Sequence, residues 1–456
     1  MRPNASALRA CARFPADPRR SLSLGAARYP LRQLRSQSSV NGPAPANGPS
    51  PGPKSGSATN PARKLDNTTK YLLLGGVLFM FMGMMPAMKN NKRYQKALNP
   101  DKFLSYTIDT KERASFDSFV MTVHPEEHDP TIPIPYLADP SDPAKASTSS
   151  GAWKFPLWSV EVKQPQIQIV REYTPLPPSS AAEAKAGILH FLVRVLPDGE
   201  VSRFLDRKLP AEQIELRGPY PTLLFKTPPD RADDEIVFIA GGSAIAPALQ
   251  AAHALLENTS APGKVRILWA VHSRADVDTS VPRAAVKPAV PGWFSSHKPT
   301  GLLDPAQDVA NPSPMMQRLQ ALKAAHGARF DARVAVTGED ASISEADIKQ
   351  TLGLSASTPM GARAAESVTR ARPYLPVASG PYSERQPKVV ARPGGEGAYK
   401  LVLVSGPDGF VDRYAGRITQ DNAPAFRRIR EGGMLDGIIE RYGNGLKGEW
   451  QVVNLD

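Results

Sequence analysis

The sequence predicts an antiparallel β-barrel followed by a doubly wound α/β domain with a parallel sheet, both behind a single N-terminal transmembrane helix. Three observations predict this order. Short alternating segments fill residues 102–227, a continuous apolar run with a glycine turn and a helical pattern begins at Asp234, and residues 71–88 carry no charge. The chain of 456 residues is long enough for two ordinary domains with added segments.

The barrel is expected over residues 99–230. Its strands are short runs of alternating apolar and polar residues, separated by turn sequences such as Pro197-Asp198-Gly199 and Gly218-Pro219-Tyr220-Pro221. The expected strands are Phe103–Ile108, Ser118–Thr122, Val160–Tyr173, Ile188–Leu196 and Ile214–Gly218. Residues 124–159 are polar and rich in Pro and Ser, which indicates an insertion.

The α/β domain is expected over residues 233–456. Its strands are continuous apolar runs, as expected for a parallel sheet that is covered on both faces. The predicted strands are Glu235–Ala240, Val265–Val271, Arg329–Val336 and Lys400–Val404, and a helical pattern that ends at Leu255 follows the first of them. Residues 278–314 and 354–397 interrupt the pattern and are expected to be insertions.

The N-terminal region predicts a targeting segment and an anchor. Residues 1–40 hold eight Arg and a single acid, Asp17, and so contribute most of the net charge of +12. This composition is typical of a mitochondrial transit peptide, and the alternative is a disordered basic tail that binds nucleic acid. Residues 41–69 are a predicted disordered linker and residues 70–89 a transmembrane helix. Basic residues flank the helix on both sides, so charge does not decide its orientation.

The rest of the composition excludes several classes of site. No later basic stripe is interleaved with aromatic residues, so nucleic acid is not an expected partner. The sole cysteine, Cys11, lies in the predicted transit peptide, so the mature protein would have no disulfide, iron–sulfur cluster or Cys-ligated zinc. The sequence shows no zinc-ligand spacing, catalytic triad or Walker loop, so no metal is expected. Redox chemistry would have to take place on a bound cofactor.

One short stretch combines three groups that suit a nucleotide with a flat ring. Arg171 and Tyr173 share one face of a predicted strand, and Thr174 lies on the other. A guanidinium suits a phosphate, an aromatic plane suits ring stacking, and a hydroxyl suits a ring nitrogen. The alternative is an ordinary strand end before the prolines that follow.

Two glycine turns come directly after predicted parallel strands. Gly241-Gly242 lies between a strand and a helix, where backbone N–H groups and the helix dipole favour a pyrophosphate. Ser405-Gly406-Pro407 follows the strand Lys400–Val404. Because parallel strands end at the same edge of a sheet, we expect both turns at the edge where such folds bind ligands.

Together, Arg-x-Tyr-Thr, Gly-Gly-Ser-x-Ile-Ala-Pro and a late Gly-Pro-Asp-Gly-Phe resemble the ferredoxin reductase superfamily, and most closely its NADH–cytochrome b5 reductase branch. The resemblance covers about residues 99–456 without the insertions. It implies an FAD-binding barrel, an NAD(P)-binding α/β domain, and NADH or NADPH as the electron donor. The strand Ile188–Val195 resembles the next strand that lines FAD.

The resemblance assigns roles residue by residue. Arg171 would bind the FAD pyrophosphate, Tyr173 would stack on the flavin ring, and Thr174 would bond near the reactive N5. Gly199 and Ser202 would complete the phosphate site. The residues that match the nucleotide motifs are Gly241, Gly242, Ser243, Pro247, Gly406, Pro407 and Phe410. Thr174 and Ser405 would lie nearest the reacting atoms.

The sequence departs from the family pattern at two positions. Ser405 stands where the family usually has Cys, and we expect slower hydride transfer. Ala244 stands where the family usually has Gly, and we expect weaker nucleotide binding because its methyl would approach the pyrophosphate. The choice of nucleotide stays open, since Ser273-Arg274 would suit a 2′-phosphate, Asp276 would suit a free ribose hydroxyl, and a solvated loop is the third interpretation.

The order of transit peptide, single anchor and reductase domains also resembles mitochondrial flavoproteins that assist cytochrome c maturation. That likeness implies an inner-membrane anchor with the globular part in the intermembrane space. Its partners would be haem, cytochrome c or the holocytochrome c synthase machinery. A mitochondrial NADH–cytochrome b5 reductase and a weakly catalytic, flavin-stabilised docking protein are the alternatives. The histidines at positions 124, 128, 190 and 253 are not assigned as haem ligands, because solvated or packed positions explain them.

Overall fold

The computed structural model describes residues 98–127, 153, 157–257, 259–281, 301–339, 341–354, 387–418, 430–438 and 450–455. The predicted transit peptide, linker and transmembrane helix lie outside these residues, as do Cys11 and His128. Among the described residues, no helix has the length and apolar character that a membrane span requires.

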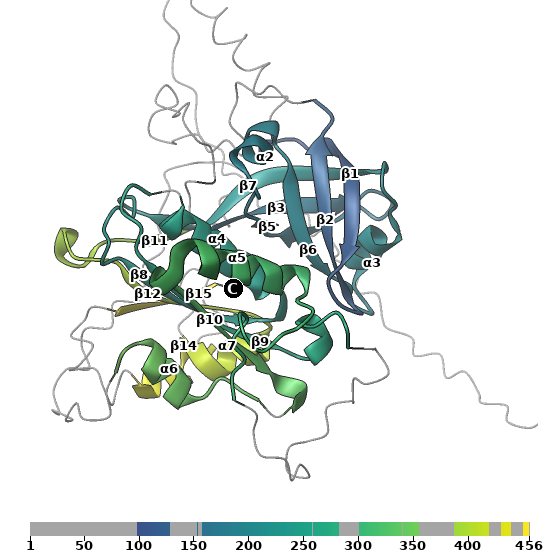
Figure 1. Cartoon of the computed structure of the whole chain (residues 1–456). Helices are drawn as coiled ribbons and strands as arrows, with labels where there is room; N and C mark the ends of the chain where they lie inside the picture. Colours follow the sequence, from purple (N-terminus) through teal and green to yellow (C-terminus); the bar gives the residue numbers. More distant parts are fainter. Residues whose placement is uncertain are drawn as a thin grey trace, which may run out of the picture. The chain divides into compact units, whose positions relative to one another are not determined.

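The first part of the fold is an antiparallel sheet (Figure 1). Its strands are β1 (Leu104–Arg113), β2 (Ser118–Pro125), β3 (Leu157–Gln164), β4 (Ile169–Tyr173), β5 (Pro175–Leu176), β6 (Leu189–Arg194) and β7 (Gln213–Phe225). They pair in the order β4-β3-β7-β1-β2-β6-β5. Only Thr174 separates β4 at one end of this path from β5 at the other, so the sheet must curl back on itself, as a barrel requires.

The interior of this sheet is filled by the inward-facing residues of alternate positions. Its largest buried side chains include Tyr106, Trp158 and Phe191. Two short helices complete this part, α2 (Ala181–Ala186) and α3 (Glu200–Arg207). Neither was predicted. α2 has six residues and none of them is buried, whereas Val201, Phe204 and Leu205 of α3 do follow helical spacing, and this signal was missed.

The expected single strand Val160–Tyr173 is wrong, because the chain forms a β-hairpin there. β3 ends at Gln164, residues 165–168 form the turn, and β4 begins at Ile169. Gln168 in this turn has a positive φ of 56°. Ile167 is 50% exposed at the tip, so it does not belong to a half-buried strand. Alternation of Ile and Gln predicted a strand, but the pairing of β3 with β4 places the reversal there.

The expected turn at Gly218-Pro219-Tyr220-Pro221 is also wrong, since these residues lie inside β7. β7 pairs with β1 through Gln213–Leu216 and with β3 as far as Leu223. Irregularities in the β3–β7 register accommodate the two prolines. The Gly218–Pro219 peptide bond is cis. The predicted turn sequence is an irregular stretch inside a long strand.

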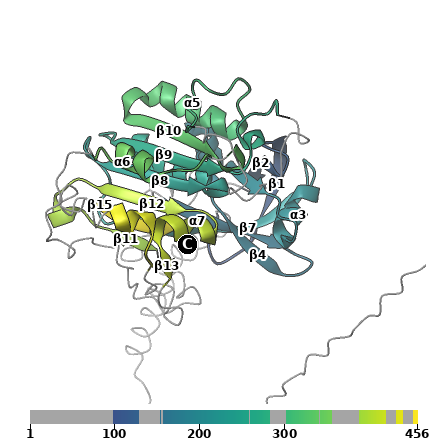
Figure 2. The ribbon, with the colours of Figure 1, turned by 90° about the horizontal axis from the view of Figure 1, so that it is seen from below.

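The second part of the fold is a parallel sheet. Its strands are β8 (Glu235–Gly241), β9 (Lys264–Val271), β10 (Phe330–Val336), β12 (Lys400–Ser405) and β15 (Trp450–Leu455). Figure 2 shows β10, β9, β8 and β12 side by side in this order, and β15 pairs with β12. The four predicted strands are confirmed, and β15 was missed. The strand order reverses direction between β8 and β12, which creates a topological switch point.

Helices cover both faces of the parallel sheet (Figure 1). The helices are α4 (Ile245–Leu256), α5 (Pro314–His326), α6 (Glu345–Thr351) and α7 (Asp408–Ala415). α4 and α5 share a core with Phe238 and Ile267, whereas α6 and α7 share a core with Val237 and Ile239. Because successive residues of a strand face opposite ways, these are the two faces of one sheet. The doubly wound arrangement is confirmed.

Part of the segment that was expected to be an insertion belongs to the fold. β11 (Lys388–Val390) pairs with β7 of the antiparallel sheet. Directly after it, Arg392 forms a buried ion pair with Asp234, at Nη1–Oδ1 2.8 Å and Nη2–Oδ2 3.2 Å. Asp234 also accepts the Tyr399 N–H at 2.8 Å. Residues 388–397 therefore fasten the end of β7 to the start of β8. A short hairpin of β13 (Arg417–Ile418) and β14 (Arg430–Glu431) follows α7.

Candidate active site

Arg171 lies on β4 beside the first turn of α3. Its Nη2 is 3.3 Å from Oε2 of Glu200, and its Nη1 donates to the Val170 carbonyl at 3.0 Å. Both side chains of the ion pair are exposed, Arg171 by 55% and Glu200 by 43%. A pair this exposed contributes little to stability, so the guanidinium is available to an incoming anion.

The start of α3 is an open set of backbone donors. Gly199 is the N-cap, and no side chain caps the first turn. A Cβ on Gly199 would overlap the Ser202 hydroxyl, which explains the glycine. Ser202 accepts the Leu196 N–H at 3.1 Å and donates to the Gly199 carbonyl at 3.3 Å. Ser202 is buried, so its role is to hold the conformation of the turn. An anion would instead bind the backbone N–H groups of the first turn of α3, where the helix dipole also favours negative charge.

Lys111 holds the other end of α3. Its Nζ donates to the carbonyls of Leu205, Asp206 and Lys208 at 2.9, 2.8 and 2.9 Å. These carbonyls lie at the end of the helix, where few backbone donors remain, and that of Leu205 also accepts the Lys208 N–H, at 3.2 Å. The cation thus fixes α3 against β1, and the first turn of the helix is fixed with it.

Tyr173 and Thr174 follow Arg171 at the point where the sheet closes. Tyr173 packs against the core of the antiparallel sheet and stays partly exposed. Burial raises the pKa of Tyr173 to about 12, against a smaller lowering by Arg171, so its phenol stays protonated at neutral pH. Thr174 is partly exposed between β4 and β5. Arg171, Tyr173 and Thr174 thus lie together, as the sequence predicted for this stretch.

The two glycine turns meet at the switch point of the parallel sheet. Ser405 on β12 lies opposite Ala240 on β8, so the next residues, Gly406 and Gly241, are neighbours. A Cβ on Gly406 would lie 3.1 Å from the Gly241 Cα. The Phe410 ring packs on both, since added Cβ atoms would lie 2.9 Å and 2.7 Å from it. Only glycine fits at either position under this ring.

Gly242 and Ser243 form a short 3-10 turn before α4. Gly242 has a φ of 58°, a conformation that favours glycine, and its carbonyl accepts the Trp269 indole N–H at 2.8 Å. Ser243 is exposed, and Pro247 is partly exposed in the first turn of α4. Ala244 is 8% exposed and packs in the core. The expectation that the Ala244 methyl approaches a bound pyrophosphate is therefore wrong.

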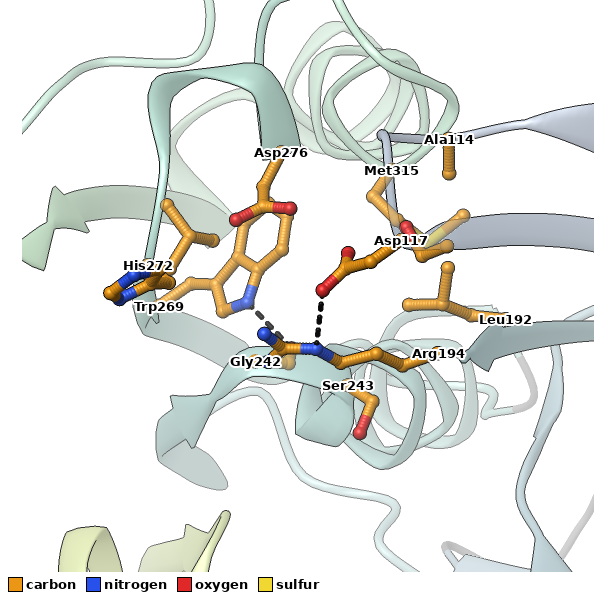
Figure 3. Close-up of a pocket in the computed structure, with 12 residues that line it drawn as sticks. Ala114, Asp117, Leu192, Arg194, Gly242, Ser243, Trp269, His272, Asp276 and Met315 are labelled. Carbon is orange, nitrogen blue, oxygen red and sulfur yellow. Dashed lines mark hydrogen bonds and ion pairs between the residues drawn. The ribbon is translucent and has the colours of Figure 1, made fainter. Parts of the chain in front are cut away.

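Arg194 is a candidate site residue that the motifs did not assign. It ends β6, and its Nε donates to Asp117 at 3.0 Å (Figure 3). A Cβ on Gly242 would lie 3.4 Å from its Nη1, so the guanidinium touches the nucleotide turn. Around it lies a cavity of about 30 Å³, enough for one water molecule. The sequence did contain a signal for this residue. In the predicted strand Ile188–Val195, Arg194 is the only charged residue apart from the titratable His190.

The residues considered for nucleotide selection have structural partners. Ser273 and Asp276 form a capping box. Burial, helped by nearby Asp117, raises the pKa of Asp276 against the lowering effect of the Ser273 hydrogen bond. Arg274 binds Glu339 through two hydrogen bonds of 3.0 and 2.8 Å. No unpaired guanidinium is therefore left at Arg274 for a 2′-phosphate, and the choice between NADH and NADPH stays open.

The groups present fit an FAD molecule. A guanidinium and an uncapped helix start suit a pyrophosphate, and a neutral, half-buried tyrosine suits a ring. At the second anion site Gly242 and Gly406 are partly exposed, whereas Gly241 is buried under the Phe410 ring. Glu200 has an unfavourable charge for a phosphate, and it lies at the exposed edge.

Comparisons with known proteins agree with this arrangement. Residues 157–225 match the family model described as "Oxidoreductase FAD-binding domain". The "NADH-cytochrome b5 reductase-like protein" of Arabidopsis thaliana is 28% identical over 181 residues, which are 40% of this chain and 49% of that protein. The "Cytochrome c mitochondrial import factor CYC2" of Saccharomyces cerevisiae is 40% identical over 75 residues, 14% of this chain and 20% of that protein.

Among solved structures, the cytochrome b5 reductase domain of Ulva prolifera nitrate reductase matches with a TM-score of 0.34 and 20% identity, covering 52% of this chain and 75% of that one. The CS-b5R domains of human Ncb5or match with a TM-score of 0.40 and 12% identity, covering 78% and 70%. The chain spans half or less of the length of the two curated relatives above.

Proposed function

Starting from its membership of the ferredoxin reductase superfamily, to which the NADH–cytochrome b5 reductases belong, we propose that this FAD-binding chain oxidises NADH or NADPH and passes the electrons to a haem acceptor. The main support is the meeting of the two glycine turns at the switch point, close to Arg194 of the antiparallel sheet. One nicotinamide donor supplies two electrons, which reduce two ferric haems to ferrous haems.

The chain's own residues bind and orient. Arg171 and the first turn of α3 would hold the FAD pyrophosphate, Tyr173 would cover the ring, and Thr174 would bond near N5. The second nucleotide would be held by Gly241, Gly242, Ser243 and Pro247 and flanked by Ser405, Gly406, Pro407 and Phe410. When bound, FAD supplies the conversion of a two-electron hydride donor into single-electron transfers.

The acceptor we favour is haem that awaits attachment to cytochrome c. The likeness to the cytochrome c import factor supports this choice, as does the predicted mitochondrial transit peptide. In this proposal the chain is anchored in the mitochondrial inner membrane, and its globular part faces the intermembrane space. It would keep haem iron ferrous for the holocytochrome c synthase machinery.

A mitochondrial NADH–cytochrome b5 reductase is the second candidate. Relatives with that name support it, among them one from Scheffersomyces stipitis that is 25% identical over 212 residues, which are 46% of this chain and 63% of that protein. The two candidates differ in their acceptor. The test compares NADH-dependent reduction of ferric haem and of cytochrome b5 by the full chain. Rapid turnover with cytochrome b5 and none with haem would overturn the haem proposal.

A docking protein with little catalysis is a candidate of another class. The Phe410 ring over Gly241 and the Glu200 carboxylate beside Arg171 support it, since both oppose ligand entry. Mixing the full chain with NADH in the absence of oxygen tests this candidate. Loss of flavin absorbance within seconds would exclude it.

A further inference from the structure

A second cavity, of about 590 Å³, lies away from the candidate active site. Its walls come from β1, β2 and β6, from Pro177–Ser179, and from α4 and α5. This volume is in the range of sites that bind small organic molecules. It uses Leu249 and His253 of α4 and Glu257 directly after this helix. The nucleotide turn precedes α4, about one and a half turns of helix from Leu249 and about three and a half from Glu257.

Arg318 of α5 brings a partly buried cation to this cavity. Its Nη1 donates to the Pro177 carbonyl at 2.8 Å. Within the described part of the chain, this is the one hydrogen bond of the guanidinium, which carries five N–H donors. Burial lowers the pKa of Arg318 despite the opposing effect of Glu183, which indicates a poorly solvated charge. An anion bound here would gain more than it would at an exposed arginine.

The neighbouring polar side chains already have hydrogen-bond partners within the protein. His190 contacts the Thr122 hydroxyl through Nδ1 and the Glu183 carboxylate through Nε2, both at 3.0 Å. Burial lowers the pKa of His190, so its imidazole is neutral at neutral pH. The remaining wall is largely apolar, with Val120, Leu249, Pro314, Ala321, Leu322 and Ala325. The cavity therefore presents the Arg318 guanidinium, with N–H donors available to a ligand, beside an apolar wall.

Two carboxylates limit the charge that the cavity accepts. Glu112 lies exposed on β1, and Glu257 lies directly after α4, where it contacts His253 and His326. Each carboxylate repels a dianion such as phosphate twice as strongly as it repels a singly charged anion, and Glu183 adds a third negative charge near Arg318. The head group that fits is a singly charged anion, and the apolar wall fits a hydrocarbon or aromatic body.

We propose that this cavity binds a small amphipathic monocarboxylate, with its head group on Arg318 and its apolar body against α4 and α5. The inference does not depend on FAD or on the nicotinamide nucleotide. The full chain is titrated with 4-phenylbutyrate by isothermal calorimetry. Parallel titrations use 4-phenylbutanol and 4-phenylbutylamine, which share its body, and inorganic phosphate, which lacks one. We expect binding of 4-phenylbutyrate alone.

Variants locate the site. Arg318→Gln keeps a donor for the Pro177 carbonyl but removes the charge, and we expect binding of 4-phenylbutyrate to weaken about tenfold or more. Ala321→Phe puts an aromatic ring into the cavity beside Arg318 and should weaken binding. Arg203→Gln is the matched control, since the exposed Arg203 also donates through Nη1 to a proline carbonyl, that of Pro197 at 3.2 Å, and it should bind as the unchanged chain does.

The opposite results would overturn the proposal. These are an absence of 4-phenylbutyrate binding to the folded chain, equal binding to the alcohol, or unchanged binding in both Arg318→Gln and Ala321→Phe. If Ala321→Phe does not fold, Arg318→Gln decides with the alcohol comparison. Far-UV circular dichroism checks the fold of each variant.

Discussion

The side-chain amide of Gln250 donates to the carbonyl of Pro175 at 2.8 Å, which ties α4 to the residue after Thr174. The Oε1 of Gln250 also accepts the Trp158 N–H of β3 at 3.0 Å. Gln250 is only 2% exposed, so water cannot replace either bond. One side chain thus joins the helix behind the nucleotide turn to the strand end that carries the flavin motif.

Gln250→Leu should destabilise the protein by about 2–4 kcal/mol, because two buried backbone groups lose their partners. It should also slow reduction of the flavin by NADH, since α4 is no longer fixed to β5. Urea denaturation and stopped-flow absorbance measure the two effects. Gln317→Leu is the control, because exposed Gln317 makes the same type of bond to Pro312 at 3.0 Å. Equal losses in both variants would contradict the role given to Gln250.

Arg171→Ala should lose FAD and keep its fold. The guanidinium is 55% exposed and its ion pair with Glu200 contributes little to stability, whereas a pyrophosphate would use it fully. The ratio of flavin to protein absorbance measures retention, and circular dichroism measures the fold. Arg113→Ala, at another exposed arginine, should retain flavin. Full retention in Arg171→Ala would show that the motif assignment is wrong.

Gly241→Ala should lower the free energy of unfolding by about 1–3 kcal/mol and weaken nucleotide binding, because its methyl meets the Phe410 ring. Adding Phe410→Leu should recover part of the stability loss. Gly409→Ala is the control, since a Cβ there meets no atom within 4 Å and α7 gains a better helix former. Thermal unfolding compares the variants. A double variant no more stable than Gly241→Ala would argue against the contact.

Arg392→Met should destabilise the chain by about 3–5 kcal/mol. It leaves the Asp234 carboxylate, which is fully buried, without its cation. Arg231→Met is a nearby comparison, because the Arg231–Asp233 pair is exposed and should contribute little. Urea denaturation measures both. If the two variants unfold at the same denaturant concentration, the buried pair is not what fastens the junction.

Asp276→Asn should stabilise the protein at neutral pH. Burial raises the pKa of the folded Asp276, so the folded state binds its proton more tightly than the unfolded state does. The stability of the unchanged chain relative to the variant therefore falls as pH rises from the unfolded pKa of about 3.9 through the raised folded value. Asn keeps an acceptor for the Ser273 N–H. Parallel stability–pH curves for the two proteins would contradict this.

Local patterns predicted the parts of the fold that depend on local sequence. The continuous apolar run of β8 and the glycines after it are sufficient to predict a buried strand and a turn. The closure of the antiparallel sheet through Thr174 was not predictable, because it depends on pairing between distant strands. Gln250 looks like an ordinary polar residue of a helix, and only the structure shows that it is buried.

In the candidate site, too, the residues in local motifs were predictable and the contacts between distant segments were not. The motifs located Arg171, Gly241 and Gly406, but not the contacts that give them their surroundings. The Phe410 ring over Gly241 and the Arg194 guanidinium beside Gly242 are both contacts between distant segments. At Ala244 the family pattern itself misled. It predicted that the Ala244 methyl approaches the bound nucleotide, but the residue packs in the hydrophobic core.

The visible absorbance spectrum of the full chain, purified in detergent and then mixed with NADH without oxygen, tests the central claim most directly. The expected result is the yellow flavin bands in the purified protein, at about one FAD for each chain, and their loss after NADH is added. A correctly folded, colourless chain that takes up no added FAD would contradict the claim.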